Sequence, residues 1–339
     1  MIRTKTWRRW GVIAAGLVAV ACTREPEPPR AIAKELTPAR SASPRVPASQ
    51  SAPAAPPTAA PAASPAKIES EYPWLKEPGA PTVAGRLDER LAPPLGFSRV
   101  ALAPGSFGAW LRRLPLAPAG TAVKSHRGGI ILPPDHDHLA AVVAIDVGAQ
   151  DLQQCADSIL RLHAEWRWSR GARDIGYRAA AGTPLPFARW ALGDRVSASG
   201  ASIAWSRSAR PIGGARTEGE ALARATHADL RVFLDTVFAW ANTGSLARDT
   251  RPIAQADIHP GDFVVQPGGP GHAVIVLDVA KAPDGRRVAL LAQGFMPAQN
   301  LHVLRPSRDA TWFSLDGSSL ATPFWPAFAW TALRRFDGT

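Results

Sequence analysis

A segment rich in proline and alanine decides which part of this chain can form a globular fold. Between Thr23 and Ser70 the sequence consists mainly of Ala, Pro and Ser and holds no aromatic residue. Such a segment has too little apolar surface to offset the entropy lost on ordering, and proline-rich chains of this kind are extended spacers. We therefore expect residues 23–70 to be a disordered linker and residues 71–339 to form a single globular domain.

The residues before the linker have the pattern of a secretory signal. Four basic residues lie within residues 1–9, and the apolar stretch Val12–Ala21 follows. That stretch is shorter than the about 20 residues that a membrane-spanning helix needs. Small residues then precede Cys22, as at the cleavage site of a bacterial lipoprotein signal, where the Cys becomes the lipidated first residue. We expect residues 1–22 to be a lipoprotein signal peptide; the alternative is an ordinary cleaved signal with an incidental cysteine.

A lipid on Cys22 would make this an exported, membrane-anchored protein of the cell envelope. The residue after Cys22 is Thr23 rather than Asp, which favours the outer membrane of a Gram-negative cell. The linker would hold the domain away from the membrane, so peptidoglycan and envelope proteins are the expected partners.

The charge of the chain argues against nucleic acid as a partner. Of the formal charge of +11, ten basic and four acidic residues within residues 1–70 account for +6, which leaves +5 for the domain. Nucleic-acid-binding proteins instead gather basic residues on one face, and the Arg residues of this domain are scattered along the sequence.

The order of patterns within residues 71–339 predicts an α+β fold. Helices are expected over residues 151–166, where Asp151 is the expected N-cap, and over residues 218–241. Strands are expected over residues 139–147 and then, in succession, over 263–265, 272–279, 288–291 and 301–304. A turn signal at Ala282–Gly285 joins two of these strands into an antiparallel hairpin. Helices followed by antiparallel strands are typical of α+β domains.

The cysteine count draws attention to Cys155. The chain has two Cys residues, and if Cys22 carries a lipid, Cys155 has no disulfide partner and is a candidate reactive thiol. Its place in the first turns of a helix would favour the thiolate through the helix dipole. The alternative is a core residue, because free Cys is among the most buried residue types and Cys155 lies on the apolar side of its helix.

A cysteine nucleophile needs a base, and His272 is the best candidate. His272 begins a strand after the Gly268–Gly271 loop, and Gln293 ends the partner strand. The hairpin would bring both residues to the same end of the sheet, where Gln293 could orient the imidazole by a hydrogen bond. Either residue could instead have a purely structural role at the sheet end. If Asp151 is the N-cap, the Cys155 amide is bonded to it, so Gln153 or Gln154 would have to stabilise an oxyanion.

These residues resemble the papain-like hydrolases of bacterial envelopes, the NlpC-type and CHAP-type peptidases and amidases. The resemblance lies in the helical cysteine, the Gly-Asp strand (Gly261–Val265), the Gly-His strand (Gly271–Ile275) and a polar residue on the next strand. It implies a papain-like helix packed on an antiparallel sheet. It also implies thiolate attack on an amide or ester of a cell-wall peptide or lipid, with Cys155 as nucleophile, His272 as base and Gln293 as orienting residue.

A second resemblance covers nearly the whole folded part. Residues 151–165, 261–280 and 291–302 are similar to motifs of the bacterial family called domain of unknown function 4846. That family has Ser-Tyr where this chain has Gly294-Phe295, which puts any role of those hydroxyls in doubt here. The family name implies no activity.

Other motifs predict no cofactor. His136 and His138 lie on one side of an extended chain and could bind a metal, but a third ligand is not evident, so we expect a charged loop there. Gly268–Gly271 leads into a strand and therefore offers no helix dipole to a phosphate. Two functions follow: a thiol hydrolase using Cys155, His272 and Gln293, or a non-enzymatic envelope lipoprotein in which Cys155 is a core residue.

Overall fold

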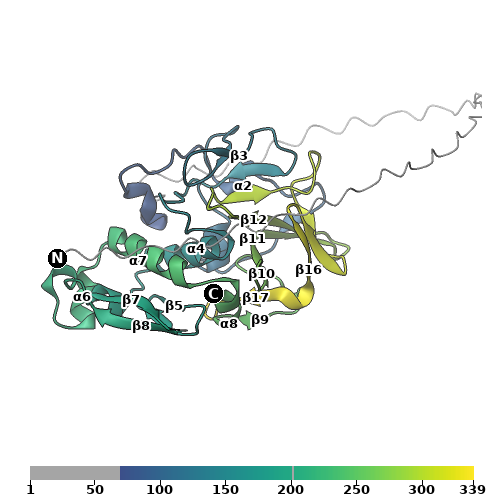
Figure 1. Ribbon diagram of the computed structural model, residues 1–339. Coiled ribbons are helices and arrows are strands. Elements are labelled where there is room, and N and C mark those ends of the chain that lie inside the picture. Colours follow the sequence, from purple (N-terminus) through teal and green to yellow (C-terminus); the bar gives the residue numbers. More distant parts are fainter. Residues whose placement is uncertain (1–68, 201) are drawn as a thin grey trace, which may run out of the picture. The chain divides into compact units, whose positions relative to one another are not determined.

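The computed structural model describes residues 69–200 and 202–339 (Figure 1). The predicted signal peptide with Cys22 and almost all of the predicted linker lie outside these residues. All described residues fall within one compact unit, and it has the predicted α+β fold, with helices packed against a large antiparallel sheet. No helix among the described residues is long and apolar enough to cross a membrane.

The main sheet of the described region has nine strands. Seven follow the order β4-β13-β12-β11-β10-β17-β9, while β1 pairs with β11 and β14 pairs with β12; every pairing is antiparallel. The strands are β1 (Ser98–Arg99), β4 (Leu139–Val142), β9 (Arg251–Pro252), β10 (Phe263–Gln266), β11 (His272–Lys281), β12 (Arg287–Gln293), β13 (His302–Leu304), β14 (Phe313–Ser314) and β17 (Leu333–Arg335).

The strands expected in the second half of the domain are confirmed as β10, β11, β12 and β13. The turn between β11 and β12 is also confirmed, since the Gly285 amide donates to the Ala282 carbonyl. The strand expected over residues 139–147 is shorter, because β4 ends at Val142. Beyond it, Val143 still bonds to Leu301, but the Ala144 carbonyl accepts from the Trp74 indole, so the regular ladder does not continue.

The central strands are buried on both faces of the sheet. Alternate residues of β11 point to opposite sides: Ala273 and Ile275 belong to the larger core, which the helices cover, and Val274 and Val276 belong to a second core. In Figure 1, α4 (Cys155–Ser169) and α7 (His227–Trp240) lie on one side of β10–β12, and β16 (Trp325–Ala329) lies on the other. This double coverage explains why these strands are apolar without alternation in the sequence.

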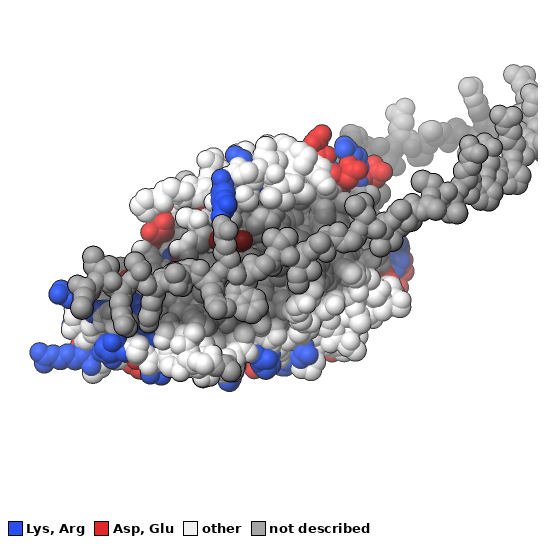
Figure 2. Space-filling view, viewed as in Figure 1, with Lys and Arg blue, Asp and Glu red and all other residues white. Residues whose placement is uncertain are grey.

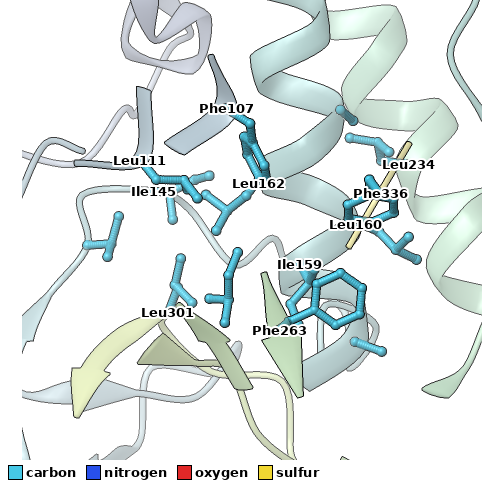
Figure 3. Close-up of a cluster of buried hydrophobic side chains, with 14 of the residues drawn as sticks. Phe107, Leu111, Ile145, Ile159, Leu160, Leu162, Leu234, Phe263, Leu301 and Phe336 are labelled. Atoms are coloured by element: carbon cyan, nitrogen blue, oxygen red, sulfur yellow. The ribbon is translucent and has the colours of Figure 1, made fainter. Parts of the chain in front are cut away.

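Helix α4 (Cys155–Ser169) supplies much of the larger core. Figure 3 shows Leu162 of α4 beside Phe107 of α3 (Phe107–Leu111) and Ile159 beside Phe263 of β10, while Leu160 points to another side of the helix. All five side chains are at most 1% exposed, and burying each contributes about 1.5–3 kcal/mol. The packing therefore fixes α4 against the sheet, and with it the residues at its N-terminus.

The predicted start of α4 at Asp151 is wrong. The helix begins at Cys155, and its N-cap is Gln154, whose amide donates to the Asp157 carboxylate. The Asp151 carboxylate instead accepts from the amide of Ala298, 147 residues away along the chain, at 2.7 Å. A long-range bond thus removes Asp151 from the capping role that its local sequence suggested.

The helix predicted over residues 218–241 is two helices. α6 (Glu218–Arg224) ends before Ala225, and α7 (His227–Trp240) begins with Thr226 as its N-cap. The Thr226 hydroxyl accepts from the Asp229 amide, and the Asp229 carboxylate accepts from the Thr226 amide. This capping box starts a new helix.

The remaining elements are short. The other α-helices are α2 (Leu87–Arg90), α3 (Phe107–Leu111), α5 (Phe187–Ala191) and α8 (Thr243–Arg248). The 3-10 helices are η1 (Pro73–Lys76), η2 (Ile212–Gly214), η3 (Gln255–Asp257) and η4 (Trp330–Ala332). Four separate hairpins pair β2 (Val123–Lys124) with β3 (Ile130–Leu132), β5 (Gly176–Arg178) with β6 (Pro184–Pro186), β7 (Asp194–Ser199) with β8 (Ser202–Arg207), and β15 (Ser319–Thr322) with β16 (Trp325–Ala329).

Charged side chains are spread over the visible part of the face in Figure 2. Lys and Arg side chains lie mostly along its lower and left margin, and others lie at the top and right among Asp and Glu side chains.

Candidate functional site

The structure brings His272 and Gln293 together. Ile275 of β11 pairs with Ala292 of β12, so the start of one strand lies beside the end of the other. The His272 Nε2 and Gln293 Oε1 atoms are 2.7 Å apart, and both side chains are at most 2% exposed. The predicted meeting of the two residues at one end of the sheet is therefore correct.

This hydrogen bond determines the tautomer of His272. An amide oxygen only accepts, so the imidazole must donate from Nε2, and in the neutral ring the lone pair then lies on Nδ1. Nδ1 is buried, and neither the Cys155 sulfur nor any other atom of the described residues forms a hydrogen bond with it. His272 is thus a buried base with an unused basic nitrogen.

Aromatic rings surround the imidazole. The ring centroids of Phe295 and Trp325 lie 4.8 and 4.9 Å from that of His272, and Phe328 lies at 6.1 Å. Burial among these rings lowers the pKa of His272 to about 4, although the bond to Gln293 acts in the opposite direction. His272 is therefore neutral at physiological pH, as a general base must be before it accepts a proton.

Cys155 lies beside the same strand. Its side chain is 5% exposed, and the backbone N–H of Ala273, the residue after His272, is directed at its sulfur. Burial raises the pKa of the thiol to about 11, and the N–H groups of Ala273, Ala156 and Cys155 itself offset only part of this rise. The expectation that the helix dipole would favour a thiolate is therefore wrong for the resting protein, because burial has the larger effect.

The backbone amide of Cys155 is not bonded to Asp151. Cys155 is the first residue of α4, so its amide is one of the helix N–H groups that lack an intrahelical partner. No carbonyl among the described residues accepts from it. The sequence-based reason for excluding this amide as an oxyanion donor therefore does not hold.

The two glutamines proposed as oxyanion donors have different surroundings. Gln153 is 1% exposed, and its side chain donates to the Asp146 carbonyl and accepts from Arg161. Gln154 lies at the edge of a cavity, and its side-chain amide donates to the Asp151 carboxylate at 3.2 Å. Of the two, only Gln154 faces space in which a ligand could lie.

This cavity, of about 390 Å³, opens beside Cys155. Its walls come from the start of α4, the end of α7, the start of α8, the loop before β11, and Met296. The lining residues are Asp151, Leu152, Gln154–Asp157, Phe238, Ala239, Ala241–Thr243, Gly268–Gly271 and Met296. His272 does not line the cavity. Its side chain lies with Val274 on the other face of the sheet, against Trp325 and Phe328.

A buried carboxyl group, that of Asp157, adjoins the cavity. One of its oxygens accepts from the Gln154 amide, and the other has no partner among the described residues. Burial raises the pKa of Asp157 to about 8, against the bonds from the backbone amides of Gln154 and Asp157. The carboxyl group is therefore mainly protonated at neutral pH.

The Gly294-Phe295 pair has a clear structural role. A Cβ atom on Gly294 would lie 2.3 Å from the Ser158 Oγ and 2.9 Å from the Gln154 carbonyl oxygen, so α4 approaches β12 too closely for any side chain. Phe295 packs against His272. The pair thus brings the Cys155 helix close to the sheet and encloses the imidazole.

The His136 and His138 pair does not form part of a larger ligand cluster. Among residues 69–200 and 202–339, no group of three or more His, Cys, Asp or Glu side chains is placed to bind a metal. The two rings pack against Phe324, and His138 Nδ1 bonds to the Arg305 carbonyl.

His302 is a site residue that the sequence analysis missed. It lies directly opposite Gln293 in the β12–β13 pairing and is fully buried. The sequence contained one signal for it. His302 is a polar residue within the strand expected over residues 301–304, and this strand follows the one that ends at Gln293.

The comparison with known families agrees with the second resemblance. The model of the family described as domain of unknown function 4846 matches residues 87–335. The chain belongs to this family.

Domain of unknown function 4846 therefore spans the main sheet and the helices packed on it, from α2 to β17. Cys155, His272, Gln293 and His302 all lie inside the matched region. No curated protein and no solved structure matches the chain. The function of the site must therefore be argued from its own geometry.

Proposed function

We propose that this protein is a thiol hydrolase of the cell envelope, in which Cys155 attacks an amide or ester of a cell-wall peptide or lipid. The observation that supports this most is the bond of 2.7 Å between His272 and Gln293. It leaves Nδ1 of His272 as a neutral base without a hydrogen-bond partner among the described residues. The next residue, Ala273, directs its backbone N–H at the Cys155 sulfur. The proposal includes a papain-like relation between α4 and the sheet.

The chemistry follows from these protonation states. Thiol and imidazole are both neutral at rest, so the proton moves from sulfur to His272 Nδ1 as the sulfur–carbon bond forms. The carbonyl π electrons pass to oxygen, and the amide of Cys155, which no carbonyl of the described residues accepts from, can donate to the resulting oxyanion. When the intermediate collapses, the departing amine or alcohol takes the proton from Nδ1. Water then cleaves the thioester by the same route and regenerates the thiol.

The geometry also sets a condition for this reaction. His272 and Cys155 are not hydrogen-bonded, and the imidazole does not line the cavity. Because His272 lies on the other face of the sheet from the helix that carries Cys155, the start of β11 must rearrange to bring Nδ1 to the thiol when substrate enters beside Met296 and the Gly268–Gly271 loop.

An activated ester tests the nucleophile. In the full chain carrying Cys22→Ser, p-nitrophenyl acetate should acetylate Cys155, as seen by intact mass and p-nitrophenolate release. Cys155→Ala should abolish acetylation, and His272→Gln should slow it by about 100-fold, the scale of general-base catalysis. His138→Gln is the control and should react like its parent, because His138 contacts Arg305 rather than the site. Equal hydrolysis by the parent and Cys155→Ala would refute the hydrolase.

A second function is favoured by the burial of the thiol. With 5% exposure and a pKa raised to about 11, Cys155 also fits a core residue of a non-enzymatic lipoprotein that binds wall material or an envelope protein. In that case iodoacetamide should alkylate Cys155 in the folded chain no faster than in urea. The cavity would then hold a ligand without changing it.

We also propose that the chain is exported and anchored through a lipid on Cys22, in the outer membrane of a Gram-negative cell. The sequence before Cys22 supports this proposal. Cys22→Ser should abolish incorporation of labelled palmitate and release the protein from the membrane fraction. Unchanged labelling would contradict the anchor.

A further inference from the structure

His302 makes a hydrogen bond with each ring nitrogen. Its Nδ1 lies 3.0 Å from the Asn300 carbonyl oxygen, and its Nε2 lies 3.5 Å from Nε2 of Gln293. The side chain is fully buried, so water cannot replace either partner. The second distance is at the long end for a hydrogen bond. This contact matters because it orients the Gln293 amide.

The Asn300 carbonyl determines which nitrogen of His302 carries the proton. A carbonyl oxygen only accepts, so Nδ1 must donate, and the lone pair of the neutral ring lies on Nε2. Burial lowers the pKa of His302 to about 4, although the hydrogen bond that His302 donates to the Asn300 carbonyl acts in the opposite direction. The ring is therefore neutral and presents an acceptor to Gln293.

That acceptor selects one of the two orientations of the Gln293 amide. In the observed orientation the NH2 group faces the His302 lone pair, and Oε1 faces His272. A flipped amide would set Oε1 against that lone pair and would present NH2 groups to His272 Nε2. His272 could then bond only by moving its own proton to Nδ1, which would remove the base.

The far end of this chain of bonds is fixed to the β2–β3 hairpin. The Asn300 side chain accepts from the Lys124 amide at 2.8 Å, and the Asn300 amide donates to the Lys124 carbonyl at 3.0 Å. Two hydrogen bonds with the Lys124 backbone, one through the Asn300 side chain and one through its amide, thus hold Asn300 and the carbonyl that orients His302.

We propose that His302 is a positioning residue that, through Gln293, keeps the proton of His272 on Nε2 and the lone pair on Nδ1. The functional consequence rests on the proposed hydrolase, but the direction of the hydrogen bonds does not. In the order Asn300 carbonyl, His302, Gln293 and His272, each group accepts a hydrogen bond from the group that follows it.

Nitrogen NMR of the full chain, labelled with 15N at histidine, tests this order directly. The chain has eight His residues; single His→Gln variants of the other seven assign their signals, and the signal of His302 follows by elimination. At about pH 7 we expect His272 to carry its proton on Nε2 and His302 on Nδ1. A His272 protonated on Nδ1, or a His302 protonated on Nε2, would overturn the proposal without any variant at His302 having to fold.

Variants at His302 then test its influence on the base. His302→Phe keeps the ring shape but offers no acceptor, so His272 should populate both tautomers, and acetylation of Cys155 by p-nitrophenyl acetate should slow by roughly tenfold, as for other orienting partners. His302→Gln can still accept from Gln293 through its side-chain oxygen and should restore both the tautomer and most of the rate. Thermal unfolding of each variant separates these effects from loss of the fold.

The outcomes distinguish the two proposals. If Cys155 is never acetylated but the tautomers are as expected, the hydrolase fails and the role of His302 in orienting His272 stands. If acetylation occurs and His302→Phe leaves the His272 tautomer unchanged, the hydrolase stands and His302 is only a packing residue.

Discussion

At the scale of single residues, the site combines ionisable groups whose charged forms are all disfavoured by burial. The pKa of Cys155 rises to about 11, that of His272 falls to about 4, and that of Asp157 rises to about 8. At pH 7 the thiol and the imidazole are therefore neutral, and the carboxyl group is mainly protonated. A reaction here must therefore create charge only while substrate is bound, when the donors around it can stabilise that charge.

Asp157 gives the fold a pH dependence. Its folded pKa lies above its ordinary value of 3.8, so the stabilisation is fully present below about pH 4 and is lost as pH rises toward 8. The loss can reach about 1.4 kcal/mol per pH unit. Asp157→Asn keeps an oxygen for the Gln154 amide and cannot titrate. Urea unfolding between about pH 5 and 9 should therefore show a weaker decline for the variant; parallel curves would contradict the raised pKa.

At the scale of elements, the close approach of α4 to β12 is what brings Cys155 to the sheet. It depends on Gly294, above which the Gln154 carbonyl and the Ser158 hydroxyl leave no room for a Cβ atom. This approach was not visible in the sequence, where Gly294 was noted only as a departure from a family motif.

Gly294→Ala should displace the N-terminus of α4. The added carbon would overlap Ser158 Oγ, and overpacking of this kind costs about 1–3 kcal/mol. Adding Ser158→Ala should recover part of the loss, because the Gln154 carbonyl remains in contact. Chemical unfolding measures both effects.

Gly219→Ala is the matched control, because Gly219 lies within α6 with open space around its Cβ position. It should be neutral or up to about 1 kcal/mol stabilising. A Gly294→Ala variant as stable as this control would show that α4 does not press on β12.

Some of these elements could be predicted from the sequence, and others could not. Runs of β-branched residues and the Ala282–Gly285 turn predicted β10–β13, and the hairpin correctly placed His272 near Gln293. The start of α4 was misplaced because Asp151 bonds to Ala298, a partner far along the chain. Local capping rules cannot detect such a bond.

At the scale of the whole molecule, a buried ionic cluster joins distant parts of the chain. Arg161 and Glu165 of α4 are 2.6 Å apart and at most 1% exposed. Arg161 also pairs with Asp146, while His227 of α7 bridges Glu165 and Glu77, each at 2.8 Å. The cluster therefore holds α4, α7, the residue after η1 and the loop after β4 together.

His227 makes this cluster sensitive to pH. Burial disfavours its charged form, but the hydrogen bond and charge of Glu165, with the bond to Glu77, outweigh burial and raise its pKa above 6.5. Its contribution is thus fully present below about pH 6.5 and is lost as pH rises through the folded value. His227→Phe should lower the free energy of unfolding by roughly 1.5–3 kcal/mol near pH 5.5, and by less near pH 8.5. Urea titrations at both values measure this; a loss that does not depend on pH would indicate packing alone.

The packing of the whole molecule also explains why only part of the site could be predicted from the sequence. His272 and Gln293 belong to one hairpin, so their meeting follows from local sequence. The burial of Cys155 and the enclosure of His272 by Trp325 and Phe328 require the completed fold. A thiolate was therefore expected where the structure has a neutral thiol.

The aromatic enclosure of His272 has a consequence for biosynthesis. The thiol at residue 155 leaves the ribosome long before Trp325 and Phe328, which come later in the chain than His272 and cover the imidazole. Nucleophile and base can thus both be synthesised while the surroundings that depress the basicity of His272 are still missing. The mature protonation state of His272 arises only after β16 has been made, and β16 follows every other element of the site in the sequence.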